Sequence, residues 1–272
     1  MVSILLKVLW GFERKMRATN DNNMELPPAV WLGFPIVSLL IIWLSPLLGY
    51  PRWKGLMTGE YGFVESATFV ILLPVIVLAG VLSARFLRFP VLPRRPALIM
   101  AAVMLFSCLA AFYFAGEEIN WGQIWFGWKT PEEWAAINYQ QETSLHNIEG
   151  MSILNNIPRL MMLIATIIGG IILPLLLLRW RRKPGVDRKI WYYLIPSWRI
   201  IPASLIAACI SIPAKFFGKG SDENLIPADY TYSYMAFVAN GGEMKEYGFA
   251  LVMLLYILGI YLLVKAQTRE RC

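Results

Sequence analysis

Charged side chains are scarce in this sequence. Asp, Glu, Lys and Arg make up 16% of its 272 residues, whereas a soluble domain carries about a quarter. Of three cysteines, Cys108 and Cys209 lie inside apolar runs and Cys272 is the last residue, which excludes a disulfide framework and a cysteine-based zinc site. Histidine occurs once, and no nucleophile motif or Gly-rich phosphate loop is present. These absences leave long apolar runs as the main feature of the chain.

Hydrophobic residues make up 57% of the sequence, and its mean hydropathy is +0.54. A helix needs roughly 20 apolar residues to cross the hydrocarbon core of a bilayer, and six runs are long enough. They cover residues 29–48, 62–84, 97–115, 157–178, 200–217 and 247–264. The sequence therefore predicts an all-α polytopic transmembrane helix bundle of about six spans. Prolines and glycines inside these runs are tolerated where neighbouring helices satisfy the backbone.

The distribution of charge predicts the orientation, because Lys and Arg near span ends stay in the cytoplasm. The termini and the connections after the second and fourth runs carry 17 basic and five acidic residues. The remaining connections carry seven basic and thirteen acidic residues. We therefore expect both termini inside and a negative outer face, in a multi-pass membrane protein in contact with membrane lipids. The net charge of +7 then reflects topology, and we expect no nucleic-acid partner.

We expect a single membrane domain over the whole chain. Apolar residues at helical spacing, beginning with Leu5 and Val8, predict an amphipathic helix on the inner leaflet. The last outer loop is either a lid over a site or a passive connector. The expected parts are a cytoplasmic segment at 1–28, the bundle at 29–264, an outer loop with the candidate site at 116–156, the lid-like outer loop at 218–246 and a cytoplasmic tail at 265–272.

The outer loop at 116–156 contains the start of a predicted interfacial helix. Thr130 can cap it, Pro131 suits its first position and Glu133 completes a capping box, so we expect a helix over about 131–141. Four tryptophans crowd the same loop. They form an aromatic belt at the membrane interface, wall a lipid-facing pocket, or do both. These residues are Trp121, Trp125, Trp128 and Trp134.

Polar residues of this loop make up the candidate site. Glu117 and Glu118 point in different directions, so we expect only one of them in any site, and Trp121 shares a face with Glu117 if the helix continues. Glu142 and His146 are four residues apart, and on a helix they could bind one ion or share a proton. A lone histidine is more often structural, but its polar neighbours favour a site. Those neighbours are Glu117, Glu118, Gln123, Glu142, Asn147 and Glu149.

The same loop carries a longer pattern. Residues 117–123 read E-E-I-N-W-G-Q, a TPEE segment follows, and residues 138–147 read N-Y-Q-Q-E-T-S-L-H-N. This stretch resembles a signature of an uncharacterised family of bacterial polytopic membrane proteins. The resemblance implies a location in the bacterial cytoplasmic (inner) membrane. Because that family has no known activity, it also implies where a site lies and says nothing about the chemistry of that site.

Acidic residues also open the second and sixth runs, where the tetrapeptide EYGF occurs twice. The simpler explanation is the helix macrodipole, which favours an acid at a helix N-terminus by about 0.3–1 kcal/mol. Glu65 lies one turn deeper, where a carboxylate must face the bundle interior, water or a cation. If the second, third and sixth spans adjoin, Glu65, Glu118 and Glu246 can converge on His146.

Arg199 lies beside the fifth run and is the one basic residue that the charge count assigns to neither face. It would need a partner inside the bilayer if that span began at Ile190. Pro196 and Pro202 favour a break in the helix, which makes Arg199 a boundary residue that extends its charge to the interface.

Three functions remain open, and the sequence leaves undecided whether the chain is an enzyme. The first is a metal-dependent enzyme that acts at the outer face on a lipid or lipid-linked substrate, with one divalent metal ion as cofactor. A carboxylate-rich donor set suits Mg, Ca, Mn or iron better than zinc. The second is a non-catalytic accessory subunit with other membrane subunits as partners, and the third is a cation- or proton-coupled carrier. For the enzyme, the catalytic candidates are Glu118, His146 and Glu117, the metal ligands Glu118, Glu142, His146 and Glu65, and the binding residues Trp121, Gln123, Asn147 and Glu246.

Overall fold

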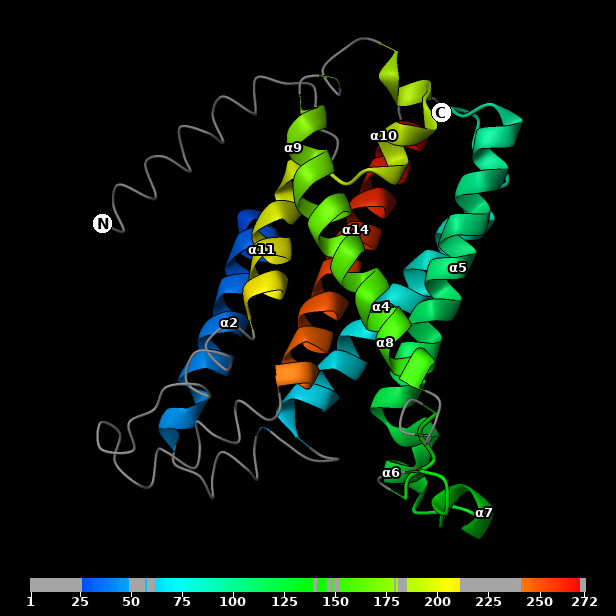
Figure 1. Cartoon of the computed structure of the whole chain (residues 1–272). Helices are drawn as coiled ribbons and strands as arrows, with labels where there is room; N and C mark the ends of the chain where they lie inside the picture. The colour runs from blue at the N-terminus through cyan, green and yellow to red at the C-terminus, as the bar shows by residue number, and fades with distance from the viewer. Residues whose placement is uncertain are drawn as a thin grey trace.

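The computed structural model shows a bundle of helices (Figure 1). Within the described residues there is no strand, only one isolated bridge between Asn138 and Ile148. The predicted all-helical class is therefore confirmed. The predicted amphipathic segment and most of the lid-like loop lie outside the described residues. The structure describes residues 26–48, 57, 62–138, 141–145, 148, 152–178, 180, 185–210 and 241–269.

Four helices of the described part are long and apolar enough to cross a membrane. They correspond to the predicted second, third, fourth and sixth runs. The helix of the fourth run consists of three consecutive segments. The π-helix η5 (Ala165–Ile172) joins α8 (Ser152–Ile164) to α9 (Leu173–Leu177). The other three are α4 (Phe63–Phe86), α5 (Arg94–Glu118) and α14 (Gly241–Arg269).

The predicted first and fifth runs give shorter helices. The first forms an apolar helix at Ala29–Leu44, in which η2 (Ala29–Gly33) leads into α2 (Phe34–Leu44), and then a 3-10 turn at Ser45–Leu48. In the fifth run the described helix is α11 (Ile201–Cys209), and residues 211–217 lie outside the described part.

The helix α14 lies at the centre of the arrangement, with α4 and α5 on one side and α2 and α11 on the other (Figure 1). Small residues permit the close contact between α14 and α11. A Cβ added at Gly248 of α14 would lie 2.8 Å from the Cα of Ala207 in α11. Membrane helices gain stability from such close approach, because lipid tails leave no hydrophobic force to drive association. Tyr247 of α14 also donates a hydrogen bond to Ser38 of α2, at 2.7 Å, which ties α2 to the bundle.

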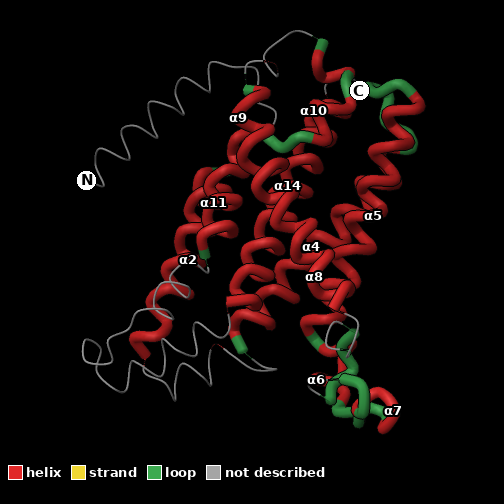
Figure 2. The backbone as a smooth tube through the Cα atoms, viewed as in Figure 1, coloured by secondary structure: helices red, strands yellow, loops and turns green. Residues whose placement is uncertain are grey.

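Along α4 and α5, acidic residues lie at one end of the bundle and basic residues at the other. At the basic end, where α14 ends, the Cζ atom of Arg85 in α4 lies over the ring of Tyr261, 5.0 Å from the ring centroid. The predicted outer acids lie at the other end, where α5 ends and α4 and α14 begin. Figure 2 shows most of the described loops at these two ends.

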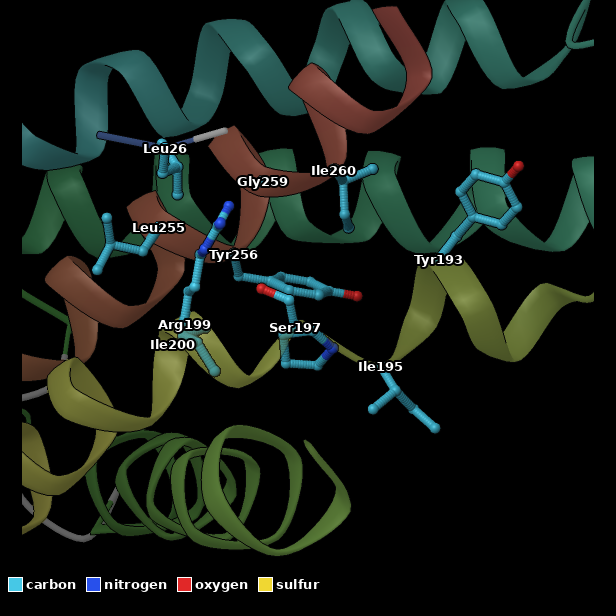
Figure 3. A pocket seen from close by; sticks show the side chains of 11 residues that line it. Leu26, Tyr193, Ile195, Ser197, Arg199, Ile200, Leu255, Tyr256, Gly259 and Ile260 are labelled. Carbon is cyan, nitrogen blue, oxygen red and sulfur yellow. The ribbon is translucent and has the colours of Figure 1, made fainter. Parts of the chain in front are cut away.

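The predicted break near Arg199 is confirmed. The helix α10 (Ile190–Leu194) ends before Pro196, and a 3-10 turn at Trp198–Ile200 leads into α11. A cavity of about 10 Å³ lies beside this break, roughly the space of one water molecule. Figure 3 shows Ser197, Arg199 and Tyr256 in its wall. Within the described residues it belongs to the basic end, away from the candidate site.

Candidate functional site

The site begins where α5 ends. Three residues in the left-handed region, Asn120, Trp121 and Gly122, with φ of 48°, 57° and 98°, fold the chain back on the helix. The Trp121 ring then covers Gly116, where an added Cβ would lie 2.9 Å from it, so a larger side chain would displace the ring. The indole Nε1 of Trp121 donates a hydrogen bond of 2.6 Å to Glu117. These two side chains adjoin as predicted, but through a turn and not through a continued helix.

Both carboxylate oxygens of Glu117 accept hydrogen bonds within the chain. Oε1 accepts from Trp121, and Oε2 accepts from the backbone N–H of Leu145 at 2.9 Å. The side chain is 7% exposed. A buried carboxylate must be compensated in this way, and here the compensation fastens the segment 141–145 to the end of α5.

Gln123, at the start of α6 (Gln123–Phe126), is a second fastening point. Its Oε1 accepts hydrogen bonds from the N–H and the hydroxyl of Thr143, at 2.8 and 2.7 Å. Its Nε2 donates to Thr130 at 3.0 Å. The amide oxygen and one N–H of the amide are therefore bonded to the loop, which favours a role in positioning the loop over one in binding a ligand.

The interfacial helix predicted over 131–141 is wrong in its length. The helix α7 runs only from Glu132 to Ala135. Its N-cap is Pro131 and not Thr130, and the hydroxyl of Thr130 accepts a hydrogen bond from Gln123. The chain turns because the Asn138 side chain donates to the carbonyl of Ser144 at 2.7 Å and its backbone pairs with Ile148. These tertiary bonds outweigh the helical preference of the segment.

The helix on which Glu142 and His146 would share one face is not present in the described part of this segment. Residues 141–143 and 145 form bends. Glu142 is half-buried there, with its N–H bonded to Asn138 at 3.4 Å. His146 and Asn147 lie outside the described residues.

Glu118 has a different set of neighbours from those that hold Glu117. It interacts electrostatically with Glu246 and Glu243 of α14, with Glu65 of α4, and with Arg159 of α8. The helix α4 packs against both α5 and α14. The second predicted span therefore adjoins both the third and the sixth, and Glu65, Glu243 and Glu246 lie near enough to influence Glu118. We call these four glutamates and Arg159 the carboxylate cluster.

Arg159 supplies a positive charge that acts on Glu118 and Glu243. Its Nη2 and Nε lie 2.6 and 2.7 Å from Oε1 of Glu246. Oε2 of Glu243 is buried without a hydrogen-bond partner, which is costly for a charged oxygen. The four carboxylates thus exceed the positive charge of Arg159, and such a group favours the uptake of a proton or another cation.

The described carboxylates do not by themselves form a metal site. Among the residues that the structure describes, no three His, Cys, Asp or Glu side chains gather closely enough to hold a metal ion. Of the four predicted metal ligands, Glu65 and Glu118 belong to the cluster, Glu142 lies in the 141–145 segment and His146 is not described. A divalent ion would therefore need donors beyond the described ones, whereas a proton or an organic cation would not.

Two members of the cluster were missed by sequence reasoning. Glu243 was explained by the helix macrodipole, and Arg159 was counted only as a charge of the outer face. A signal for Arg159 was present, because it lies inside the fourth apolar run, two residues past its start, and an arginine there requires a partner.

An exposed aromatic surface adjoins this end of the bundle. Trp125 of α6 packs edge-on against Phe69 of α4, with ring centroids 4.8 Å apart. Phe126 and Trp128 stack on each other at 5.7 Å. Trp125 and Phe126 are 57% and 76% exposed. Apolar side chains this exposed on a helical membrane protein indicate contact with lipid or with another protein.

Comparison with known proteins does not add a family to this geometry. No protein-family model matches the chain, and no curated protein and no solved structure matches it either.

Proposed function

We propose that the chain forms a six-span bundle of the bacterial cytoplasmic membrane, with both termini inside and the carboxylate cluster outside. The support is the separation of charge between the two ends of the described bundle, with Arg85 at one end and Glu65 and Glu118 at the other. Lys and Arg are retained on the cytoplasmic side. Four helices that can span the membrane and the apolar helix Ala29–Leu44 supply most of the required spans.

For the function, we propose that the carboxylate cluster binds a cationic group and acts at the outer face on a lipid or lipid-linked substrate. The observation that carries this proposal is the surroundings of Glu118, which interacts with three other glutamates and one arginine. Carboxylates at a membrane interface are costly to bury and are best stabilised by a cation. Proton transfer by one of several crowded carboxylates is a common way for such a group to act on a substrate.

Glu118 is the residue that we assign to the cation and to proton transfer, with Glu65, Glu243 and Glu246 around it. Glu117 and Gln123 would position the loop instead of touching a ligand, since their polar atoms are already bonded within the chain. Should a divalent metal be the cation, His146 and Glu142 would be its further ligands.

The test is cation binding by the purified chain. Mn²⁺ and ethylammonium would be titrated at low ionic strength into the wild type, Glu118→Gln and a matched control, Glu132→Gln. Glu132 is an exposed glutamate of α7. We expect saturable binding of at least one cation in the wild type and the control, and its loss in Glu118→Gln. Equal binding by both variants, or no binding by the wild type, would overturn the proposal.

A further inference from the structure

The aromatic corner formed by Phe69 and Trp125 lies within the predicted depth of the membrane. Phe69 is six residues after the start of α4, about 9 Å along a helix that rises 1.5 Å per residue. Trp125 reaches it from α6, which follows the left-handed turn after α5. The turn therefore brings a tryptophan back along the side of a spanning helix, where more than half of its surface stays exposed.

This corner continues an exposed apolar stripe on α4. Val70, Leu73 and Val77 are 60%, 44% and 63% exposed, and they recur at the three- and four-residue spacing of one helical face. Leu73 lies one turn beyond Phe69 on that helix. A surface of this kind on a spanning helix meets the acyl chains of lipids, so Trp125 extends the lipid-facing surface toward the outer end.

The polar end of the same surface is Glu65. It precedes Phe69 by four residues and therefore lies one turn nearer the outer end on the same face. Glu65 interacts electrostatically with Glu118. A molecule that lies along α4 with its chain against Phe69 and Trp125 therefore has its head beside two carboxylates of the cluster.

The chemistry of that head follows from the charge. Carboxylate oxygens outnumber the positive groups that act on Glu118, so an anionic head would be repelled. A primary ammonium is compact and carries three N–H donors that can reach several carboxylates. It needs no short, fixed coordination distances, which agrees with the lack of a metal-binding group among the described carboxylates.

We infer that a membrane lipid with a primary-ammonium head docks along α4, with its acyl chain against Phe69 and Trp125 and its ammonium beside Glu65 and Glu118. This inference rests on the proposed function for the head of the lipid. The position of the chain rests on the exposed aromatic surface alone.

The full chain would be reconstituted with equal amounts of phosphatidylethanolamine, phosphatidylcholine and phosphatidylglycerol, and retained lipids would be counted by native mass spectrometry. The three heads carry a primary ammonium, a quaternary ammonium without N–H donors, and no cation. We expect the wild type to retain phosphatidylethanolamine preferentially. Glu65→Gln should abolish the preference, and Trp125→Ala should lower retention about threefold to tenfold, as expected from loss of an aromatic contact.

Two further variants control for poor folding and for the loss of another exposed tryptophan. Trp125→Phe preserves an aromatic ring and should retain the lipid even if Trp125→Ala folds poorly. Trp134→Ala removes an exposed tryptophan of α7 and should behave like the wild type. Equal retention of the three lipids, or equal retention by Trp125→Ala and Trp134→Ala, would overturn the inference. So would a protein that co-purifies with the wild type and is lost with Trp125→Ala while lipid retention is unchanged.

Failure of this inference differs from failure of the proposed function. If Glu118→Gln loses cation binding while the wild type shows no lipid preference, the cation site stands and the lipid assignment fails. If Glu118→Gln binds cations like the wild type, the proposed function fails on its own test.

Discussion

Both Nε and Nη2 of Arg159 in α8 lie within 2.7 Å of a single oxygen of Glu246 in α14. The two side chains are 41% and 19% exposed, so water screens the pair only in part. The contact joins the fourth and sixth predicted spans at the acidic end of the bundle.

Arg159→Ala should therefore lower the free energy of unfolding by about 1–2 kcal/mol, because it removes a charge-assisted contact that is partly screened. The same change should raise the affinity of the cluster for added cations, since a competing positive charge is gone. Thermal unfolding in detergent and the Mn²⁺ titration measure the two effects. Arg88→Ala, which changes an exposed arginine near the opposite end, is the control.

A double variant distinguishes loss of the Arg159–Glu246 contact from destabilisation by either substitution alone. Adding Glu246→Gln to Arg159→Ala removes the uncompensated carboxylate and should recover part of the lost stability. If the double variant is as unstable as the sum of the two single changes, the pair is not coupled and our account of it is wrong.

Glu117→Gln should loosen the segment 141–145 while leaving cation binding intact. The glutamine can still accept one hydrogen bond, but its NH₂ group would face the N–H of either Trp121 or Leu145 and lose the other bond. We expect a cost of about 1–3 kcal/mol at a buried position. Hydrogen exchange at the Leu145 amide should become faster than in Glu133→Gln, an exposed control in α7. Loss of cation binding in Glu117→Gln with unchanged exchange would instead place Glu117 in the site.

Four of the predicted spans appear as helices long and apolar enough to cross a membrane, and they were predictable because the requirement of the bilayer is local. An apolar run predicted at 62–84 appears as Phe63–Phe86, and the length and composition of that segment alone account for it. The break before Arg199 was predictable for the same reason, since Pro196 acts on its own neighbours.

The arrangement of the site depended on contacts that no local pattern contains. Thr130 matches a capping motif, yet its hydroxyl oxygen accepts a hydrogen bond from the side chain of Gln123. Trp121 adopts a left-handed conformation that is uncommon for a bulky residue, stabilised by its bond to Glu117 and its place over Gly116. Arg159 and Glu246 are 87 residues apart, so their contact appears only when α8 and α14 are packed.

Gly248→Ala should destabilise the bundle by overpacking. Its new Cβ would lie 2.8 and 2.9 Å from the Cα and Cβ of Ala207, and the backbone of α11 would have to shift. Such changes cost about 1–3 kcal/mol. Gly169→Ala is the matched control, because nothing lies within 4 Å of its added Cβ. In a helix the alanine should be neutral or stabilising by up to about 1 kcal/mol. Melting temperatures in detergent that fall equally for both variants would contradict this account of the α11–α14 contact.

The orientation can be measured with single cysteines. In a chain carrying Cys108→Ser, Cys209→Ser and Cys272→Ser, Lys129→Cys lies between α6 and α7 at the acidic end, and Arg188→Cys lies in the short turn before α10 at the basic end. If basic residues stay in the cytoplasm, a membrane-impermeant maleimide added to intact cells should label Lys129→Cys at once. It should label Arg188→Cys only after the membrane is permeabilised. The reverse pattern would mean that the bundle has the opposite orientation, with the carboxylate cluster on the cytoplasmic side. A lipid of the outer leaflet could not reach the cluster there. Labelling of both cysteines in intact cells would instead show that the two ends of the bundle do not lie on opposite sides of the membrane.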